Sequence, residues 1–293
     1  MAFNFTIGCD PEIFLKKNNK GHSCFGLIPG DKQNPFKTDG GAVQVDGMAA
    51  EFNTDPVPIH NFDEFNANII KQLKFLRNEI PKEYSLSIVP VMDFDKKHMD
   101  EQPEAAKELG CDPDYNAYTL KPNPRPEGAS VYFRSGAGHI HYGWGADIPT
   151  DNEDHLKICA NFVKCLDATV GLFMTFIDRE PRRRELYGKA GAFRPKSYGV
   201  EYRTPSNVWI INRDTRKLIH ALSKKTIDLA SNGREACDII GVREDEIQEI
   251  INTGNHALAK IYLDNFLSYG FYSSVRQAWD SIKHSMRVQH GDS

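Results

Sequence analysis

The segment Asp10-Pro-Glu12 decides how this sequence is interpreted, because its pattern returns in His139-Ile-His141 and in Glu201-Tyr-Arg203. In each segment two polar side chains stand at positions i and i+2. Side chains alternate between the two faces of a β-strand, so each pair points to one face of a sheet. Carboxylates, imidazoles and an arginine on one face are groups that bind metal ions and phosphate. We therefore expect a sheet that carries a metal-and-phosphate site on one face.

A fourth segment, residues 46–53, adds another pair of this kind, Glu51 and Asn53. A hairpin turn at Asp46-Gly accounts for the aspartate but not for Glu51, which interrupts an otherwise apolar stretch. We expect Glu51 to supply a further oxygen ligand and Asn53 to supply a positioning amide.

Each segment also has a purely structural alternative. Asp10-Pro-Glu12 fits a solvated turn, and Pro11 favours the edge or the beginning of a strand because it donates no ladder hydrogen bond. The paired imidazoles of His139 and His141 also fit a hydrogen-bonded core pair, a zinc site or a contact to phosphate. These alternatives remain open on the segments taken one by one.

The stretch 182–194 is basic and contains glycine. Arginine forks suit phosphate oxygens, and Lys189 lies in Gly-Lys-Ala-Gly, where it can act as a point charge on a loop. A solvated turn explains part of this stretch, but it explains Arg194 and Arg203 less well. We expect Arg184, Lys189, Arg194 and Arg203 to contact phosphate groups of a bound ligand.

The periodicity of the whole chain predicts an α+β fold. Apolar residues at steps of three and four predict helices at about 62–80 and 156–177, and the helical pattern returns after about residue 214. The strands between them lack regular βαβ spacing, which favours a mainly antiparallel sheet packed with helices. Residues 93–128 are rich in charge and proline and predict a long loop excursion that sets specificity. The expected domain layout is a catalytic core over residues 1–211, including this excursion, and a helical C-terminal annex of the same domain over residues 212–293.

Composition narrows the function classes. With 293 residues, 40% hydrophobic and 26% charged, the chain has the balance of a globular protein. A formal net charge of −4 gives no general attraction to nucleic acid or to an anionic membrane. The apolar runs are shorter than a membrane span, and the N-terminal residues lack the pattern of a signal peptide. We expect a cytoplasmic location, the host cytoplasm if the gene belongs to a phage, and no membrane or general nucleic-acid partner.

Taken in order, the four motifs resemble the phage-type COOH–NH2 ligases, or amidoligases, of the glutamine synthetase and glutamate–cysteine ligase superfamily. The resemblance spans about residues 5–210. It implies a curved antiparallel sheet whose concave face holds ATP and two or more divalent ions, Mg²⁺ or Mn²⁺. The metal ligands that it implies are Asp10, Glu12, Glu51, His139 and Glu201. It also implies that His141 lies near the γ-phosphate and that Arg194 and Arg203 stabilise the transferred phosphoryl group. One departure is that glutamine synthetase has two spaced glutamates where this chain has Glu51 with Asp46 and Asn53.

The function that the resemblance implies is ATP-dependent amide formation through an acyl phosphate, catalysed by a carbon–nitrogen ligase. Its substrates would be a small-molecule or peptide carboxylate and an amine, and a homo-oligomer is compatible with it. Two alternatives stay open. One is a guanidino-kinase-like phosphotransferase, and the other is a non-catalytic phage protein that binds metal or nucleotide.

Overall fold

The computed structural model describes residues 4–107, 114–124, 132–145, 148–151, 154–236, 238, 241, 243–268 and 273–290. Its strands are β1 (Thr6–Lys17), β2 (Lys20–His22), β3 (Phe36–Thr38), β4 (Gly41–Asp46), β5 (Ala49–Thr54), β6 (Val57–Pro58), β7 (Tyr84–Ser87), β8 (Val91–Asp93), β9 (Tyr115–Asn116), β10 (Lys121–Pro122), β11 (Phe133–Ser135), β12 (Gly138–Gly143), β13 (Ala192–Lys196) and β14 (Gly199–Tyr202). Its helices are α1 (Phe62–Glu79), α2 (Lys96–Asp100), α3 (Glu104–Lys107), α4 (His155–Leu166), the π-helical η1 (Asp167–Gly171), α5 (Leu172–Ile177), α6 (Arg183–Leu186), the 3₁₀ turn η2 (Asn207–Ile210), α7 (Arg213–Ser231), α9 (Glu244–Thr253), α10 (His256–Ser268) and α11 (Ser273–His290).

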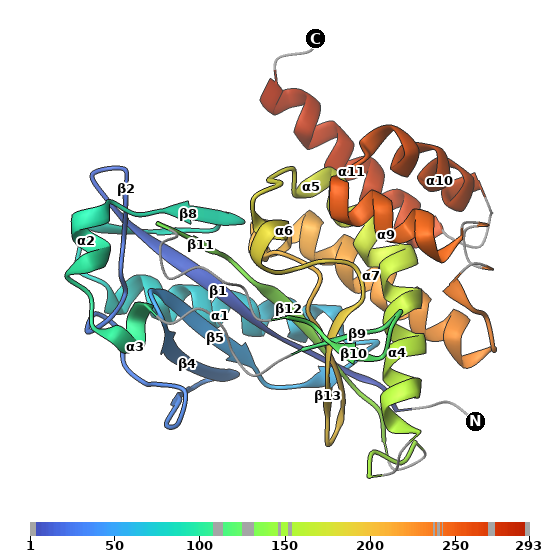
Figure 1. Cartoon of the computed structure of the whole chain (residues 1–293), viewed down its shortest axis with the longest axis horizontal. Helices are drawn as coiled ribbons and strands as arrows, with labels where there is room; N and C mark the ends of the chain where they lie inside the picture. Colours follow the sequence, from blue (N-terminus) through green and yellow to red (C-terminus); the bar gives the residue numbers. More distant parts are fainter. Residues whose placement is uncertain are drawn as a thin grey trace.

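One large sheet organises the molecule (Figure 1). Its strand order is β10-β9-β13-β14-β12-β1-β5-β4-β3, and β2, β6 and β7 also pair with β1. Strands β8 and β11 form a separate pair. Every strand pair among the described residues is antiparallel. The predicted α+β class, with a mainly antiparallel sheet and a helical C-terminal region, is confirmed.

The long strand β1 lies at the centre of this sheet and shows the predicted alternation. Ile7, Cys9 and Ile13 belong to the main hydrophobic core on one face. The residues between them, among them Asp10 and Glu12, therefore point to the opposite face.

The expectation that Pro11 marks a strand edge or beginning was wrong, because Pro11 lies inside β1. The pairing of β1 with β5 begins only at Glu12. Two residues before Pro11, the backbone N–H of Cys9 donates to the side-chain hydroxyl of Thr54 and not to a backbone carbonyl of β5. The missing N–H of Pro11 therefore removes no bond from the ladder with β5.

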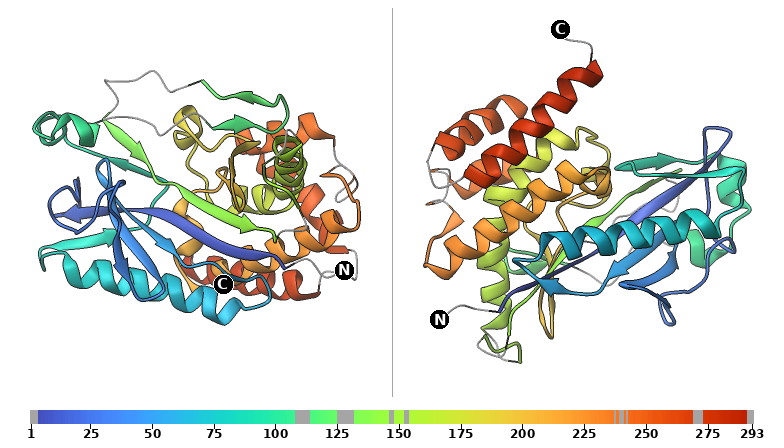
Figure 2. Two further views of the ribbon diagram at one scale, coloured as in Figure 1. Left: turned by 90° about the horizontal axis from the view of Figure 1, so that it is seen from below. Right: turned by 180° about the vertical axis from the view of Figure 1, so that it is seen from behind.

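Helices cover the core face of the sheet (Figure 2). Helix α1 crosses it, with Phe65 and Ile69 fully buried in the same core as the apolar residues of β1. Asn61 caps this helix, since its side chain accepts a hydrogen bond from the backbone N–H of Glu64. The opposite face of the central strands is left for polar side chains.

The helical stretch His155–Ile177 is long and apolar enough to cross a membrane by length and composition alone. However, 78% of its most apolar window is buried inside the molecule, as is usual for the core helix of a globular domain. This helix lies against β13 and β14, and the C-terminal helices pack beyond it.

A buried carboxylate in η1 ties this helix to the sheet. Asp167 accepts hydrogen bonds from the hydroxyls of Tyr202 on β14 and Tyr118, at 2.6 and 3.0 Å, and from the backbone N–H of Gly191 at 2.6 Å. Burial raises the pKa of Asp167 to about 6 despite these donors. Because Tyr202 stands between Glu201 and Arg203 in the chain, this contact helps to fix the strand that carries both side chains.

Residues 93–128 are only partly an excursion. Helices α2 and α3 bury Met99 and Ala106 in a small second core on the polar face of the sheet, together with Phe14 of β1. The hairpin of β9 and β10 adds to the edge of the main sheet through β13. The proposed division into a core over 1–211 and an annex over 212–293 stays a prediction.

Candidate functional site

The sheet register places the predicted polar side chains side by side on the face opposite α1. Directly opposite one another across neighbouring strands lie Asp10 and His139, His141 and Glu201, Glu201 and Arg194, and Glu12 and Glu51. The residues alternating with them, Ile140 and Tyr202, belong to the core. Four segments that are far apart in sequence therefore build one polar surface.

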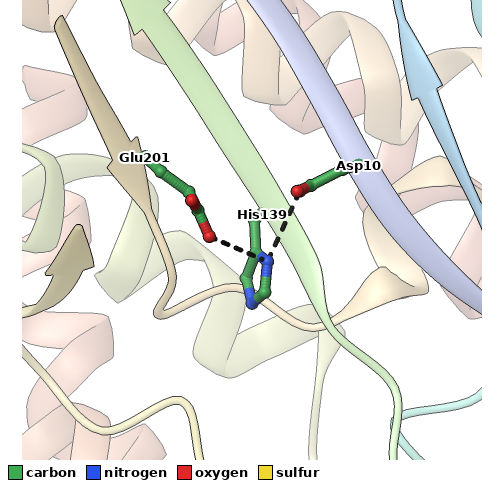
Figure 3. A group of neighbouring side chains, drawn as sticks. All are labelled: Asp10, His139 and Glu201. Carbon is green, nitrogen blue, oxygen red and sulfur yellow. Dashed lines mark ion pairs between the residues drawn. The ribbon is translucent and has the colours of Figure 1, made fainter. Parts of the chain in front are cut away.

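Asp10, His139 and Glu201 form a group that we call the imidazole cluster (Figure 3). The Nδ1 atom of His139 lies 3.4 Å from a carboxylate oxygen of Asp10 and 3.4 Å from one of Glu201. All three ligand atoms lie within 4.8 Å of one another, a spacing that can hold one metal ion.

Glu201 is 1% exposed and is surrounded by cations. Arg203 pairs with Oε1, while Lys196 and Arg194 lie 2.7 and 3.5 Å from Oε2. Burial and Asp10 act to raise the pKa of Glu201, but Arg203 and the two nearby imidazoles outweigh them and lower it to about 2. This carboxylate is charged at every physiological pH.

The second histidine of the pair supports the same cluster. His141 places Nε2 3.0 Å from Asp10 and Nδ1 2.5 Å from the hydroxyl of Tyr198. Burial alone would raise the pKa of Asp10, but His141 and His139 hold it well below its usual range. The imidazole cluster is therefore neutralised by residues of the chain itself.

Glu12, Asp46 and Glu51 form a second group that we call the carboxylate cluster, again with ligand atoms within 4.8 Å of one another. Burial, and then the charge of Asp46, raise the pKa of Glu12 to about 7, although the N–H of Ala137 donates to it at 2.8 Å. Burial and the charges of Asp10 and Asp46 raise the pKa of Glu51 well above its usual range. Asp46 is held by an ion pair of 2.7 Å with Lys32.

The donor sets of both clusters fit divalent cations. Mg²⁺ and Mn²⁺ favour carboxylate oxygens, and Mn²⁺ also accepts imidazole. In the carboxylate cluster a bound cation would also relieve the repulsion that raises the pKa of Glu12 and Glu51. The residues that would hold the ions are the three members of each cluster.

A cavity of about 470 Å³ adjoins the two clusters. On the sheet side its lining includes Glu12, Asp46 and His139, together with Arg203 from the end of β14. Its other walls are formed by connecting segments and short elements, with Phe25, Lys32, Ala105, Arg134 and Tyr187 among their residues. Ala105 lies in α3, so the segment expected to set specificity does contribute to the wall.

Three further residues were predicted to belong to this site: Asn53, Arg184 and Lys189. Asn53 is on the same face of β5 as Glu51, one pair further along and opposite Ala42. Arg184 donates to the carbonyl of Glu180, and Lys189 is exposed, with its backbone carbonyl accepting from the hydroxyl of Thr204. The structure therefore does not bring these two side chains to the clusters.

Some residues of the site were missed by sequence reasoning. Lys196 stands at i+2 from Arg194 on β13, so the same periodicity could have found it. Lys32 and Asp114 come from loops, where no period applies; Asp114 lies 3.3 Å from Nε of Arg203. Asp46 was explained by its turn, but it is also a member of the carboxylate cluster.

Comparisons with known proteins bear on the class. The structure is similar to that of a bifunctional glutathione synthetase from Pasteurella multocida, with a TM-score of 0.52, 10% identity and 94% of this chain covered. The chain spans 46% of the length of that protein, and at this identity the likeness concerns the fold. Two structures of GmaS, without ligand and with ADP, match with TM-scores of 0.37, identities of 13% and 12%, and coverage of 91% and 99% of this chain and 69% and 74% of theirs. These scores are too low to carry an argument. No curated protein sequence matches the chain.

The fold is thus similar to that of a known ligase, and the sequence adds a family match. Residues 127–269, just under half of the chain, match the family described as phage phiEco32-like COOH.NH2 ligase, type 2. The predicted resemblance to phage-type COOH–NH2 ligases is thereby confirmed. The matched region contains His139, Arg194, Glu201 and Arg203, whereas the carboxylate cluster lies before it in the sequence.

Proposed function

We propose that this chain joins a carboxylate to an amine, using ATP and forming an amide bond through an acyl phosphate. The observation that carries the proposal is the pair of three-residue clusters on one sheet face, beside a cavity and a group of cations. Two adjacent divalent-ion sites with arginines close by suit a triphosphate whose terminal phosphoryl group is transferred.

In the first step a carboxylate oxygen of the substrate bonds to the γ-phosphorus while the bond to the β–γ bridging oxygen breaks, releasing ADP. In the second step the amine nitrogen attacks the acyl carbon, the bond to the phosphate oxygen breaks, and the nitrogen loses a proton. The products are an amide and inorganic phosphate. Divalent ions, when bound, neutralise phosphate charge in this chemistry.

The residues of the chain act mainly by position and charge. Arg203 pairs with Glu201 and also lines the cavity, so its guanidinium can follow charge that develops on the transferred phosphoryl group. Arg194 and Lys196 add positive charge from the neighbouring strand. Glu12 reaches from the carboxylate cluster into the cavity, which is where the acceptor carboxylate would bind.

The same proposal covers the remaining assignments. The cofactors are ATP with two or more Mg²⁺ or Mn²⁺ ions, and the substrates are a small-molecule or peptide carboxylate and an amine. The reaction takes place in the cytoplasm, the host cytoplasm if the gene belongs to a phage. Arg184, Lys189 and Asn53 remain predicted nucleotide contacts, which require movement of the first two side chains.

The test is Mg²⁺-dependent release of ADP and phosphate from ATP in the presence of pooled amino acids, peptides and amines. A product mass equal to the two substrates minus water identifies the ligation. Glu12→Ala and Arg203→Ala should abolish turnover, with circular dichroism confirming that the variants fold.

Matched controls are Glu79→Ala, an exposed residue of α1, and Arg213→Ala, which is exposed and pairs with Asp63. Both controls should retain wild-type rates. Near-normal turnover in Glu12→Ala or Arg203→Ala would contradict the proposed position of the active site.

A further inference from the structure

Lys32 stands out because its ammonium group contacts a candidate metal ligand and because the residue also lines the cavity. Nζ lies 2.7 Å from Oδ1 of Asp46, the member of the carboxylate cluster nearest the turn between β4 and β5. The side chain of Lys32 is 49% exposed and that of Asp46 is 16% exposed. The pair therefore sits at the boundary between solvent and the buried cluster.

The backbone that carries Lys32 is held firmly against the sheet. The carboxylate of Asp31 accepts hydrogen bonds from the N–H groups of Gln33 and Asn34, each at 2.8 Å, which closes a tight turn. Gly30 accepts a bond from the N–H of Val45 on β4. Gly30 has φ of +82°, and a Cβ there would meet the carbonyl oxygen of Val43 at 2.4 Å. Any change at Lys32 is therefore a rotation of its side chain rather than a closure of the loop.

The ammonium group and a divalent ion compete for the same carboxylate. Three carboxylates within 4.8 Å of one another attract any nearby cation, and Lys32 supplies a single positive charge to them. A divalent ion supplies twice the charge and binds several oxygens at once, whereas an ammonium group beside it would be repelled. Lysine is suited to exchange because its charge is a compact point on a flexible stem.

The imidazole cluster shows why Lys32 differs from Lys196, which also lies 2.7 Å from a cluster carboxylate. Glu201 keeps Arg203 and Arg194 as partners whether or not Lys196 stays. At the carboxylate cluster three acidic groups lie close together, and Lys32 pairs with one of them.

The cavity offers a second position for the displaced ammonium group. Lys32 lines the same cavity as Glu12 and Arg203, so rotation away from Asp46 leaves its charge facing the space where the anionic substrate binds. A carboxylate, or the acyl phosphate formed from it, is the chemical class that would replace Asp46 as its partner.

We infer that Lys32 is an exchangeable counter-ion of the proposed active site. Its ammonium neutralises the carboxylate cluster in the metal-free chain, yields Asp46 to a divalent ion, and then contacts the anionic group of the substrate in the cavity. This inference rests on the proposed function.

The first test titrates Mn²⁺ alone into the metal-free protein by calorimetry. Lys32→Met should bind Mn²⁺ about five- to tenfold more tightly than wild type, because the competing positive charge is gone. The tighter site is the carboxylate cluster, which is identified by its loss in Glu51→Gln. Lys32→Arg keeps the charge and should match wild type. Lys71→Met is the matched control: Lys71 is 44% exposed and pairs with Asp39 at 3.0 Å, away from the clusters, so its loss should leave the affinity unchanged.

The second test adds inorganic phosphate to protein saturated with Mn²⁺. Lys32→Met should bind phosphate about fivefold more weakly than wild type and Lys71→Met, because the released ammonium is missing. Equal Mn²⁺ affinity, or equal phosphate affinity, in wild type and Lys32→Met would overturn the inference alone. A wild-type chain that binds no Mn²⁺ would overturn the proposed metal sites and the inference with them.

Discussion

The imidazole cluster and the carboxylate cluster lie on adjoining strands of one sheet face, yet the pKa values of their acids shift in opposite directions. In the imidazole cluster the pKa values of Asp10 and Glu201 are lowered. In the carboxylate cluster the pKa values of Glu12 and Glu51 are raised. Burial acts in the same direction in both, so the difference comes from the neighbours.

The charged neighbours of the two clusters differ. Imidazoles and three cationic side chains surround the first, which is electrostatically complete without any bound ion. In the second cluster acidic groups outnumber the cations: Lys32 pairs with Asp46, while Glu12 and Glu51 lie directly opposite each other. A bound divalent ion should therefore change the electrostatics of the second cluster more than those of the first.

The largest expected effect tests the first half of this comparison. Glu201→Gln should lower the free energy of unfolding of the metal-free protein by about 3–5 kcal/mol, because it removes the charge of a buried carboxylate that Arg203 and Lys196 contact. Urea denaturation monitored by circular dichroism measures it. A loss below about 1 kcal/mol would show that these cations do not depend on Glu201.

The effect of intermediate size is the loss of stability at low pH, to which a histidine among the helices contributes separately from the two clusters. His220 on α7 is buried against the rings of Phe62 and Phe65, and burial lowers its pKa to about 4. The unfolded chain, with an ordinary histidine pKa, therefore binds more protons between about pH 6.5 and 4, and stability falls as the pH drops through that window.

Between pH 7 and pH 5, wild type should lose about 2 kcal/mol more unfolding free energy than His220→Gln. Urea unfolding of both proteins at the two pH values gives the comparison. Parallel pH profiles would assign the acid sensitivity to groups other than His220, the clusters included.

The sequence could predict the first cluster better than the second for a physical reason. Side chains of a strand alternate between its two faces, so a polar pair at i and i+2 predicts one polar face without any knowledge of the fold. Three segments have this pattern: Asp10-Pro-Glu12, His139-Ile-His141 and Glu201-Tyr-Arg203. The antiparallel register then brings these faces together, and helix periodicity sets the other face. Most of the polar surface follows from local pattern alone.

The remainder depends on contacts that no local pattern encodes. Lys32 and Asp114 reach the site from loops, and their partners lie far away in the sequence. In the basic stretch 182–194, charge alone does not show where each side chain points. Arg183 of that stretch is 1% exposed and donates to the backbone carbonyls of Thr204 and Pro205, so it braces the end of β14 from inside.

The smallest expected effect tests the second half of the comparison. Glu51 lies directly opposite Glu12 across β5 and β1, and like charges so placed destabilise a sheet by about 0.2–1 kcal/mol. Glu51→Gln should therefore raise the unfolding free energy of the metal-free protein by about that amount at pH 8. This gain in stability should shrink as the pH falls toward the ordinary pKa range of a glutamate. Because the pKa of Glu51 is raised in the folded chain, folded wild type binds the proton at a higher pH than the unfolded chain does. The protonated Glu51 then no longer repels Glu12.

In the same variant the stabilisation that Mg²⁺ gives to wild type should be smaller, because the site at the carboxylate cluster is lost and a bound ion stabilises only the state that binds it. Thermal unfolding with and without Mg²⁺ measures both parts on one sample, and Glu79→Gln on the surface of α1 serves as the control. A variant that is less stable than wild type without metal would mean that Glu51 is already paired in the free chain. The two clusters would then be alike, and the contrast between a cluster whose charges are balanced by the chain and one with an excess of acids would fail.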